Sequence, residues 1–522
     1  MRRRHTIGYL RRPTTEVHIG KVTIGGDFPV AVQSMTNTPT LDTDASVAQI
    51  CRIADAGADI VRLTAQTTAH SRNLGEIRRQ VRAKGYDIPL VADIHFNPQA
   101  AFAAAEEVEK VRINPGNFVD PGRTFVKLEF TDEEYAAEIQ KIRDKFVPFL
   151  QLCRERGVAI RIGVNHGSLS DRIMSRYGDT PAGMVESAME FLRVCRDEDF
   201  TDVVISIKAS NVVVMTQTVR LLVEAMEKEG MAFPLHLGVT EAGDGEDARV
   251  KSAVGIGSLL VDGIGDTIRV SLAEDPECEV PVARMILDHV ATLAPRVDGA
   301  TVTDIQLKSK NREPQVIGFD EVDMADDLVL SVEYPNVVDD ALARANAVED
   351  DKTVYVIGNY PDSLSKEQVK IAAAVDFGYL MLNYDFGGLA IVAPQLSDQE
   401  RADLALGILQ ATRKRISKTE YIACPSCGRT LFDLQTTLAK VKEATQELKG
   451  LKIGVMGCIV NGPGEMADAD YGYVGAGPGR VSIYRGKECV EKNIPADEAL
   501  PRLLALIKSD GRWPANDEAS AD

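Results

Sequence analysis

The sequence predicts an α/β protein whose N-terminal part is a (β/α)8 barrel of the TIM type. Two observations lead to this prediction. From residue 30 onward, short apolar, β-branched runs alternate with amphipathic helical segments, a pattern typical of a parallel sheet built from βαβ units. Eight such runs occur within residues 1–285, and a barrel of eight strands usually needs about 250 residues.

The expected strands are rich in Val, Ile and Leu, which is typical of a sheet buried on both faces. They are VAVQSMT (30–36), DIVRLT (59–64), LVADIHF (90–96), KVRINPGN (110–117), AIRIGVN (159–165), VVISIKAS (203–210), LHLGVTEAG (235–243) and DTIRVSL (266–272). Between them lie segments with helical spacing of apolar residues, such as AFAAAEEVE and AEIQKIRDKFVPFLQLCRERG.

Each run carries polar side chains towards its C-terminal end, where the active sites of such barrels lie. These residues are Asn37, Arg62, Thr64, Asp93, His95, Arg112, Asn114, Arg161, Asn165, Lys208, Glu241, Arg269 and Ser271. One or two of them could be structural ion pairs within the barrel. Five cations from five strands at one mouth would be costly without compensation, however, so they indicate a multiply anionic ligand.

Residues 286–415 predict an inserted α/β domain. They contain strand-like pieces, among them TVYVIGN and LAIVAPQL, and helical pieces such as KEQVKIAAAV. Residues 320–352 hold eleven acidic side chains against two basic ones, and we interpret them as a solvated acidic face. No motif points to chemistry here, so we expect a spacer domain.

Residues 416–508 predict a third, α+β domain that holds a cluster of cysteines, and residues 509–522 are expected to form a disordered tail. CPSC at 424–427 is followed about thirty residues later by CIVNGPGE at 458–465. The glycines after Cys458 let backbone N–H groups approach cluster sulfurs, which favours an iron–sulfur centre. Glu465 is then the expected fourth ligand, an oxygen donor that can yield its place to a substrate.

A structural zinc site is the alternative interpretation. It needs four closed ligands, and no histidine follows His289, so it would have to use Cys489 together with Cys424, Cys427 and Cys458. The glycine-rich GYVGAGPGR (472–480) suggests a phosphate loop, but hairpin turns explain it more simply. Four other cysteines are scattered singly, and we expect small buried side chains there: Cys51, Cys153, Cys195 and Cys278.

Composition excludes several classes of partner. The net charge of −19 argues against nucleic acid, because binding to phosphate backbones requires clustered Lys and Arg. No apolar run is long enough to cross a membrane, and the basic start of the chain lacks the apolar stretch of a secretory signal. The sparse cysteines do not form a disulfide framework, so we expect a cytoplasmic protein.

With these residues assembled, the chain resembles the 4-hydroxy-3-methylbut-2-en-1-yl diphosphate synthase family of the non-mevalonate isoprenoid pathway. Ten segments carry the resemblance in the family's order: VQSMTNT, ADIVRLT, VADIHFN, VRINPGN, RIGVNHGSL, ISIKAS, GVTEAG, GIGDTIRVSL, CPSCGRTLFDL and GCIVNGPGE. The segment 286–415 is similar to the extra domain of the longer, three-domain form of the family.

The resemblance implies a [4Fe-4S] cluster bound by Cys424, Cys427, Cys458 and Glu465. It implies the substrate 2-C-methyl-D-erythritol 2,4-cyclodiphosphate, which is opened and dehydroxylated with two electrons from ferredoxin or flavodoxin. Glu241 would protonate the leaving hydroxyl. The diphosphate would be held by Arg62, Arg112, Arg161, Asn165, Lys208, Arg269 and Ser271. Asp93, His95 and His166 are expected at the barrel mouth without an assigned role.

Two further expectations concern partners. Residues 411–490 carry twelve Lys or Arg against eight Asp or Glu, so they are a candidate docking face for an acidic electron carrier, although a solvated helix explains them as well. The C-terminal domain must close over the barrel, either within one chain, with the inserted domain as a spacer, or between the chains of a homodimer. The rival classes are a zinc-bearing or metal-independent barrel enzyme, such as an aldolase or a pterin-type transferase, and a non-catalytic iron–sulfur carrier.

Overall fold

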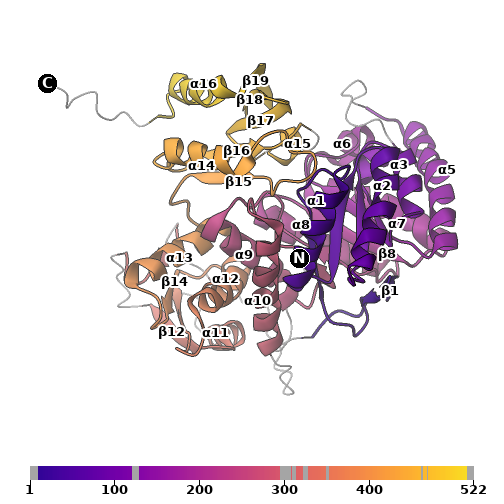
Figure 1. The fold of residues 1–522 in the computed structure, drawn as a ribbon. Coiled ribbons are helices and arrows are strands. Elements are labelled where there is room, and N and C mark those ends of the chain that lie inside the picture. The colour runs from indigo at the N-terminus through magenta and orange to yellow at the C-terminus, as the bar shows by residue number, and fades with distance from the viewer. Residues whose placement is uncertain are drawn as a thin grey trace.

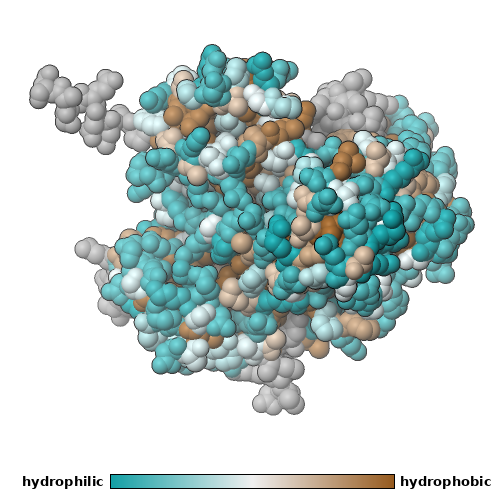
Figure 2. Space-filling model, viewed as in Figure 1, coloured by the Kyte–Doolittle hydropathy of each residue, from teal (hydrophilic) through white to brown (hydrophobic). Residues whose placement is uncertain are grey.

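The structure, a computed structural model, describes residues 10–119, 129–293, 307, 313–320, 327–347, 352–459, 462–466 and 468–513. It contains three units, a barrel, an inserted α/β unit and a C-terminal unit, which lie against one another (Figure 1). None of the helices within these ranges is both long and apolar enough to cross a membrane. Hydrophilic residues dominate the face in Figure 2, which is notched between the C-terminal and inserted units.

The N-terminal unit is an eight-stranded parallel barrel, as the sequence predicts. Its sheet has the order β8-β7-β6-β5-β4-β3-β10-β9, and a parallel bridge between Ile205 and Leu235 brings the two edge strands together. The strands are β3 (Ala31–Met35), β4 (Ile60–Ala65), β5 (Leu90–Ile94), β6 (Lys110–Ile113), β7 (Ala159–Asn165), β8 (Val203–Lys208), β9 (His236–Leu237) and β10 (Thr267–Ile268). Seven of them lie within one of the predicted runs, and β4 continues one residue beyond its run, to Ala65.

The helices of the barrel surround this sheet, and most begin at a residue whose side chain caps the first turn. Thr131, for example, forms a capping box with Glu134 at the start of α5, which ends at Gly157 in the left-handed conformation. The helices are α1 (Thr43–Asp55), α2 (Thr68–Ala83), α3 (Pro98–Ala105), α4 (Pro115–Phe118), α5 (Asp132–Arg156), α6 (Asp171–Tyr177), α7 (Pro181–Asp197), α8 (Val212–Lys228), α9 (Gly245–Val261) and α10 (Glu279–Thr292), with a 3-10 turn η1 (Pro276–Cys278).

A hairpin closes the N-terminal end of the barrel. Strands β1 (Val17–Ile19) and β2 (Val22–Ile24) pair antiparallel. Their buried side chains form one apolar cluster with residues at the N-terminal ends of the barrel strands, among them Ala31, Ile60 and Ala159. The mouth at the opposite end, where the strands finish, is therefore the open end of the barrel.

The inserted unit contains a four-stranded parallel sheet of order β11-β14-β13-β12. Its strands are β11 (Gln315–Val316), β12 (Leu328–Glu333), β13 (Val354–Asn359) and β14 (Gly388–Val392), and its helices are α11 (Val337–Ala345), α12 (Lys366–Asn383) and α13 (Asp398–Ala411). Helix α12 packs on α9 of the barrel, where Gly257 lies beneath Val375 and Gly378 beneath Val254. The acidic stretch predicted at 320–352 falls partly outside the described residues.

The C-terminal unit is a mixed sheet with helices, and it lies over the barrel mouth (Figure 1). Strands β15 (Glu420–Ala423), β16 (Lys452–Met456) and β17 (Tyr471–Gly477) are parallel, whereas β18 (Arg480–Arg485) and β19 (Glu488–Pro495) are antiparallel additions. The helices are α14 (Leu434–Thr445), α15 (Gly462–Glu465) and α16 (Ala496–Ser509). We call this unit, residues 416–508, the cap.

Three smaller predictions can be compared with the cap and the core. GYVGAGPGR forms the β17–β18 hairpin, so the simpler interpretation is confirmed. All eight cysteines are free; Cys153 and Cys195 are buried as expected, but that expectation is wrong for Cys51 and Cys278, which are only partly buried. Residues 514–522 of the predicted tail lie outside the described residues, and Asp510 before them pairs with Arg485 at 2.7 Å.

Candidate active site

A cavity lies between the barrel mouth and the cap, with about 730 Å³ of empty space, part of it open to solvent. Its barrel side is lined by Met35, Arg62, Asp93, His95, Arg112, Arg161, Asn165, Ser206, Lys208, Thr240, Glu241, Arg269 and Ser271. Its cap side is lined by Cys424, Pro425, Ser426, Cys427, Arg429, Thr430, Met456, Gly457, Cys458 and Gly462. The cavity thus brings every predicted diphosphate ligand, Glu241 and the three predicted cysteine ligands into one site.

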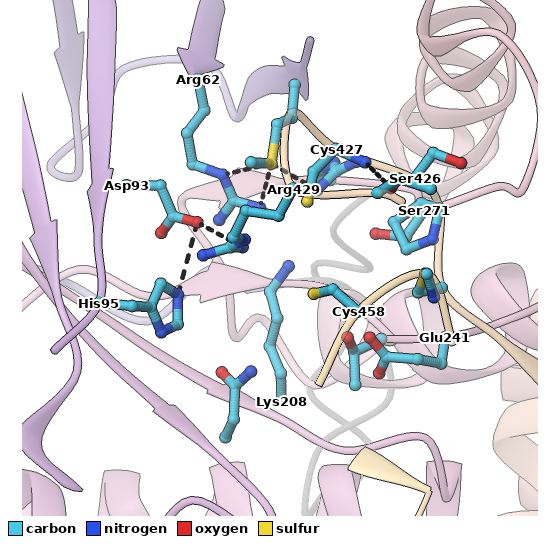
Figure 3. A pocket seen from close by; sticks show the side chains of 18 of the residues that line it. Arg62, Asp93, His95, Lys208, Glu241, Ser271, Ser426, Cys427, Arg429 and Cys458 are labelled. Atoms are coloured by element: carbon cyan, nitrogen blue, oxygen red, sulfur yellow. Dashed lines mark hydrogen bonds and ion pairs between the residues drawn. The ribbon is translucent and has the colours of Figure 1, made fainter. Parts of the chain in front are cut away.

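Strand register explains why the barrel cations converge. Arg62 on β4 pairs in register with Met35 on β3, and Arg112 on β6 lies opposite both Asp93 on β5 and Arg161 on β7. Alternate residues of a strand point to the same face, so these side chains all enter the barrel interior at similar height. Figure 3 shows Arg62, Asp93 and Lys208 entering the space below the cap from different strands.

Arg112 is the best-held of these cations. Its Nη1 lies 3.1 Å from Asp93 Oδ1, and its Nη2 donates to the Gly163 carbonyl at 2.8 Å and to Asn165 Oδ1 at 3.1 Å. It also contacts His95. Burial and the charge of Arg112 lower the pKa of His95 to about 3, so this imidazole is neutral at ordinary pH.

Arg62 and Arg161 are poorly satisfied by contrast. Among the described residues, Arg62 donates to the thioether of Met35, at 3.0 Å from Nε and 2.8 Å from Nη2, and sulfur is a weak acceptor. Burial lowers its pKa to about 10, against the opposing effect of Asp93. Arg161 is 1% exposed, and its Nε and Nη1 have no hydrogen-bond partner among the described residues. Donors left unpaired in this way favour binding of an anion with several oxygens.

Lys208 and Arg269 complete the cationic wall. Burial, followed by the charges of Arg62 and Arg269, lowers the pKa of Lys208 well below its ordinary value. Arg269 is held by two bonds to Glu279, at 3.1 and 2.9 Å, and Glu279 also accepts from Ser34. Arg269, like Arg112 with Asp93, therefore has a buried structural ion pair behind it, and the sequence predicts one or two such residues.

Glu241 lies at the seam between barrel and cap. It is 3% exposed, and its φ of 49° places a non-glycine residue in the left-handed region, a strain of order 1 kcal/mol or more that is typical of functional sites. The next residue, Ala242, forms a parallel bridge with Ala423 of the cap, directly before Cys424. The backbone thus ties the carboxyl group and the first cysteine together.

The cap contributes three thiols from two loops. The Gly457 amide donates to Cys424 Sγ at 3.3 Å, the kind of backbone bond expected beside a cluster sulfur. Burial raises the pKa of the Cys424 thiol. Within the described residues, no group of three His, Cys, Asp or Glu side chains is close enough to bind one metal ion. Three cysteines from two loops that line one cavity, with a backbone amide donating to one of the sulfurs, have the chemistry of iron–sulfur ligands.

The fourth predicted ligand is not tested. Glu465 ends α15, but its side chain lies outside the part of the chain that the structure describes. Cys489, which the zinc alternative requires, lies on β19 with its Sγ 3.6 Å from the Glu491 carbonyl, whereas the other three cysteines line the cavity.

Several polar residues expected at the mouth have other roles. The Asn37 amide bonds with Gln49, Thr64 bonds with Thr40, and the Asn114 side chain caps α4. His166 lies 3.5 Å from Asp179, in the loop that touches α15. Asp93 and His95, by contrast, do line the cavity.

Sequence reasoning missed Arg429. Its guanidinium lies 3.4 Å from Asp93 of the barrel, and its side chain is 8% exposed. Burial alone lowers the pKa of Arg429, but Cys427, Asp93 and Cys458 together raise it, so this group is a cation at the centre of the site. The only signal in the sequence is its place directly after CPSCG.

Comparison with known proteins agrees with this geometry. The model of the GcpE TIM-barrel domain matches residues 14–284, and that of the GcpE protein C-terminal domain matches residues 420–509. A protein of Parabacteroides distasonis is 51% identical over 97% of this chain and 99% of its own length, and one of Bacteroides fragilis is 50% identical over 97% of both. A more distant relative from Leptospira interrogans is 40% identical over 98% of both chains.

All three relatives are named 4-hydroxy-3-methylbut-2-en-1-yl diphosphate synthase (flavodoxin). The matched domains together span most of the barrel and the cap, and the relatives cover nearly the whole chain, inserted unit included. The resemblance seen in the sequence is confirmed: the chain belongs to the GcpE family, the 4-hydroxy-3-methylbut-2-en-1-yl diphosphate synthases.

Proposed function

We propose that this chain is an iron–sulfur oxidoreductase that converts 2-C-methyl-D-erythritol 2,4-cyclodiphosphate into 4-hydroxy-3-methylbut-2-enyl diphosphate in non-mevalonate isoprenoid biosynthesis. One observation carries the proposal: a single cavity has a cationic barrel wall on one side and three cysteines on the other. A diphosphate ester suits the first wall, and redox chemistry suits the second.

The reaction takes two electrons and one proton. The carbon–oxygen bond to phosphate breaks with its oxygen remaining on the diphosphate, and the neighbouring hydroxyl leaves as water after accepting the proton. The donor protein supplies both electrons. The product diphosphate carries one more negative charge than the cyclic substrate, so a strongly cationic wall suits both the start and the end of the reaction.

The barrel residues anchor the diphosphate in this proposal. The unpaired donors of Arg161 and the weakly paired Arg62 take phosphate oxygens, while Arg112 is oriented by Asp93 and Asn165. Lys208, Arg269 and Ser271 complete the set. Anchoring at one end fixes the reacting carbons relative to the cysteine loops, which converts binding energy into orientation.

A [4Fe-4S] cluster would be held by Cys424, Cys427, Cys458 and Glu465, and it would supply electrons and Lewis acidity to the reacting oxygen. Glu241 is the proton donor for the leaving hydroxyl. Its buried position at the seam beside Cys424 supports this role, because a general acid must lie within reach of the group that it protonates. The cap over the mouth excludes water from the site.

The proposed electron donor is flavodoxin, which the relatives' names give, or a ferredoxin. The basic residues of the cap remain the candidate docking face. Reduction rates that fall as salt rises would support docking by charge, and rates independent of salt would contradict it. We propose a cytoplasmic location for the enzyme.

In the structure the cap covers the barrel of its own chain. We propose that catalysis also runs within one chain, with the inserted unit as the spacer. Activity that persists on dilution is the expected result. Mixing an inactive barrel variant with an inactive cluster variant distinguishes the alternative, because recovered activity would mean that closure runs between the subunits of a dimer.

The decisive experiment is anaerobic reconstitution with iron and sulfide, followed by turnover of the cyclic diphosphate with reduced flavodoxin. We expect broad visible absorption and product formation, with Cys489→Ser as a variant that leaves both unchanged. Glu465→Cys should keep the cluster but lose most turnover, because a thiolate closes the exchangeable position. Colourless protein, or cluster-loaded protein without turnover, would overturn the proposal.

A further inference from the structure

Arg429 is a buried cation that contacts Cys427 and Asp93 but leaves two of its three nitrogens without a partner among the described residues. Its side chain is 8% exposed, and its ion pair with the described part of the chain joins Nη2 to Asp93 Oδ2 at 3.4 Å, whereas strong charged hydrogen bonds measure about 2.7–2.9 Å. Its Nε and Nη1 are buried without a hydrogen-bond partner among the described residues. Each such donor costs free energy unless a ligand satisfies it.

Asp93 cannot be the full partner of Arg429, because it is already committed to the barrel. Its Oδ1 accepts from Arg112 at 3.1 Å, and its Oδ2 lies 3.6 Å from His95 Nε2. The carboxylate is therefore shared among several groups, and Arg429 receives the longest of its guanidinium contacts. Figure 3 shows Arg429 extending from the cysteine loop of the cap towards Asp93, above the space that Lys208 enters.

The charge of the cavity points the same way. Six Arg and Lys side chains line it, against the carboxylates of Asp93 and Glu241. Five of the six cations come from the barrel, and Arg429 is the one that the cap contributes. A planar guanidinium whose Nε and Nη1 lack partners among the described residues matches the several oxygens of a diphosphate better than it matches a carboxylate that is already occupied.

We propose that Arg429 is a diphosphate-binding residue carried by the cap, with Asp93 as its partner only while the cavity holds no anion. When a diphosphate fills the barrel, Arg429 donates to it through Nε and Nη1. Anion binding and cap closure are then coupled, because one anion is held by groups from both units. This inference deepens the proposed function, since it assumes that the ligand is a diphosphate.

The test uses the reconstituted full chain, kept oxidised so that no turnover occurs, with inorganic pyrophosphate as the probe. Affinity is measured by calorimetry, and cap closure by hydrogen exchange in β15 and β16. We expect Arg429→Gln to weaken pyrophosphate binding about 10- to 100-fold and to abolish the slowing of exchange that pyrophosphate causes in wild type. Arg429→Lys should recover part of the affinity, because lysine keeps the positive charge but lacks the planar set of N–H donors of the guanidinium.

Lys487→Gln is the matched control. Lys487 also pairs across the cap–barrel boundary, 3.7 Å from Asp179, but its side chain is 64% exposed and does not line the cavity. Its removal should leave pyrophosphate affinity unchanged. If Arg429→Gln binds pyrophosphate as tightly as wild type, the inference is wrong. The same holds if the variant loses iron and sulfide but keeps its affinity, because Arg429 then serves the cluster alone.

The outcome is separable from the fate of the proposed function. Wild type that binds pyrophosphate through Arg429 but fails to convert the cyclic diphosphate would refute the reaction and leave the anion site standing. Wild type that converts the substrate, with Arg429→Gln equal to it in affinity, would refute the anion role alone.

Discussion

The barrel meets its two neighbours through interfaces of opposite character. Against the inserted unit the contact is close and mainly apolar: Gly257 and Gly378 let helices α9 and α12 approach until Val375 and Val254 touch the opposite helix. The pair of His289 and Asp376 that crosses this contact is buried. Against the cap the contact is mainly polar. Ion pairs cross it between Lys251 and Glu420 at 2.9 Å, Lys442 and Asp244 at 2.6 Å, and Lys418 and Asp247.

This difference indicates that the interface with the inserted unit is permanent, whereas the interface with the cap can open. Separating the inserted unit from the barrel would expose closely packed apolar surface to water, which costs free energy. The inserted unit therefore stays on the barrel. Partly exposed ion pairs contribute little each, because water solvates the separated charges well. The cap can therefore leave the mouth at small cost, as entry of a substrate requires, while its position on closure is still defined.

The largest expected effect on stability comes from a substitution at the interface between the barrel and the inserted unit. Asp376 is fully buried and accepts from His289 Nε2 at 2.8 Å and from Tyr360 at 2.9 Å. Asp376→Ala leaves both groups without an acceptor and should lower the free energy of unfolding by about 3 kcal/mol. Chemical denaturation measures this, with the exposed Asp362→Ala as a control that should change stability by less than about 0.5 kcal/mol. Equal stabilities would contradict a permanent interface.

A smaller effect tests the close packing of α9 and α12. A Cβ at Gly257 would lie 2.5 Å from a methyl group of Val375, so Gly257→Ala should destabilise the protein by about 2 kcal/mol. Gly407 on α13 is the matched glycine, because its nearest neighbour, Val250, is 3.9 Å away. Gly407→Ala should instead stabilise by up to about 1 kcal/mol through helix propensity. If both variants behave alike, the contact is not tight.

At the cap the expected effect is on turnover rather than stability. Gly167 of the barrel touches Gly464, and a Cβ on Gly167 would lie 2.2 Å from the Gly464 carbonyl oxygen. Gly167→Ala should hold the cap away and lower kcat about 10- to 100-fold, while the free energy of unfolding falls by only about 1 kcal/mol. Gly178 also has a positive φ, but a Cβ there would have its nearest atom 3.6 Å away, so Gly178→Ala should keep kcat whatever it costs in stability.

The smallest effect concerns the ion pairs themselves. Lys442→Gln should cost less than about 1 kcal/mol of cap association, and high salt should reproduce this loss in wild type. Hydrogen exchange in β16 should therefore speed up with ionic strength, whereas exchange in α12 should not. Equal salt sensitivity in the two segments would remove the distinction between the interfaces.

The sequence predicts those features that depend on periodicity and on neighbours along the chain. The eight barrel strands, the convergence of Arg62, Arg112 and Arg161, and the two cysteine loops all follow from such patterns. Arg429 did not, because its role depends on Asp93, a residue 336 positions away in the chain. The Gly167–Gly464 contact and the buried Asp376 pairings were missed for the same reason: nothing local shows which surfaces of two units will meet.

The closed N-terminal end of the barrel has a kinetic consequence. Val17, Ile19 and Ile24 fill the N-terminal end of the barrel, so within the described part of the chain substrate and product are expected to share the entrance at the opposite end, beneath the cap. Because substrate and product diphosphates need the same cationic wall, inhibition by product is expected to be competitive with the cyclic diphosphate.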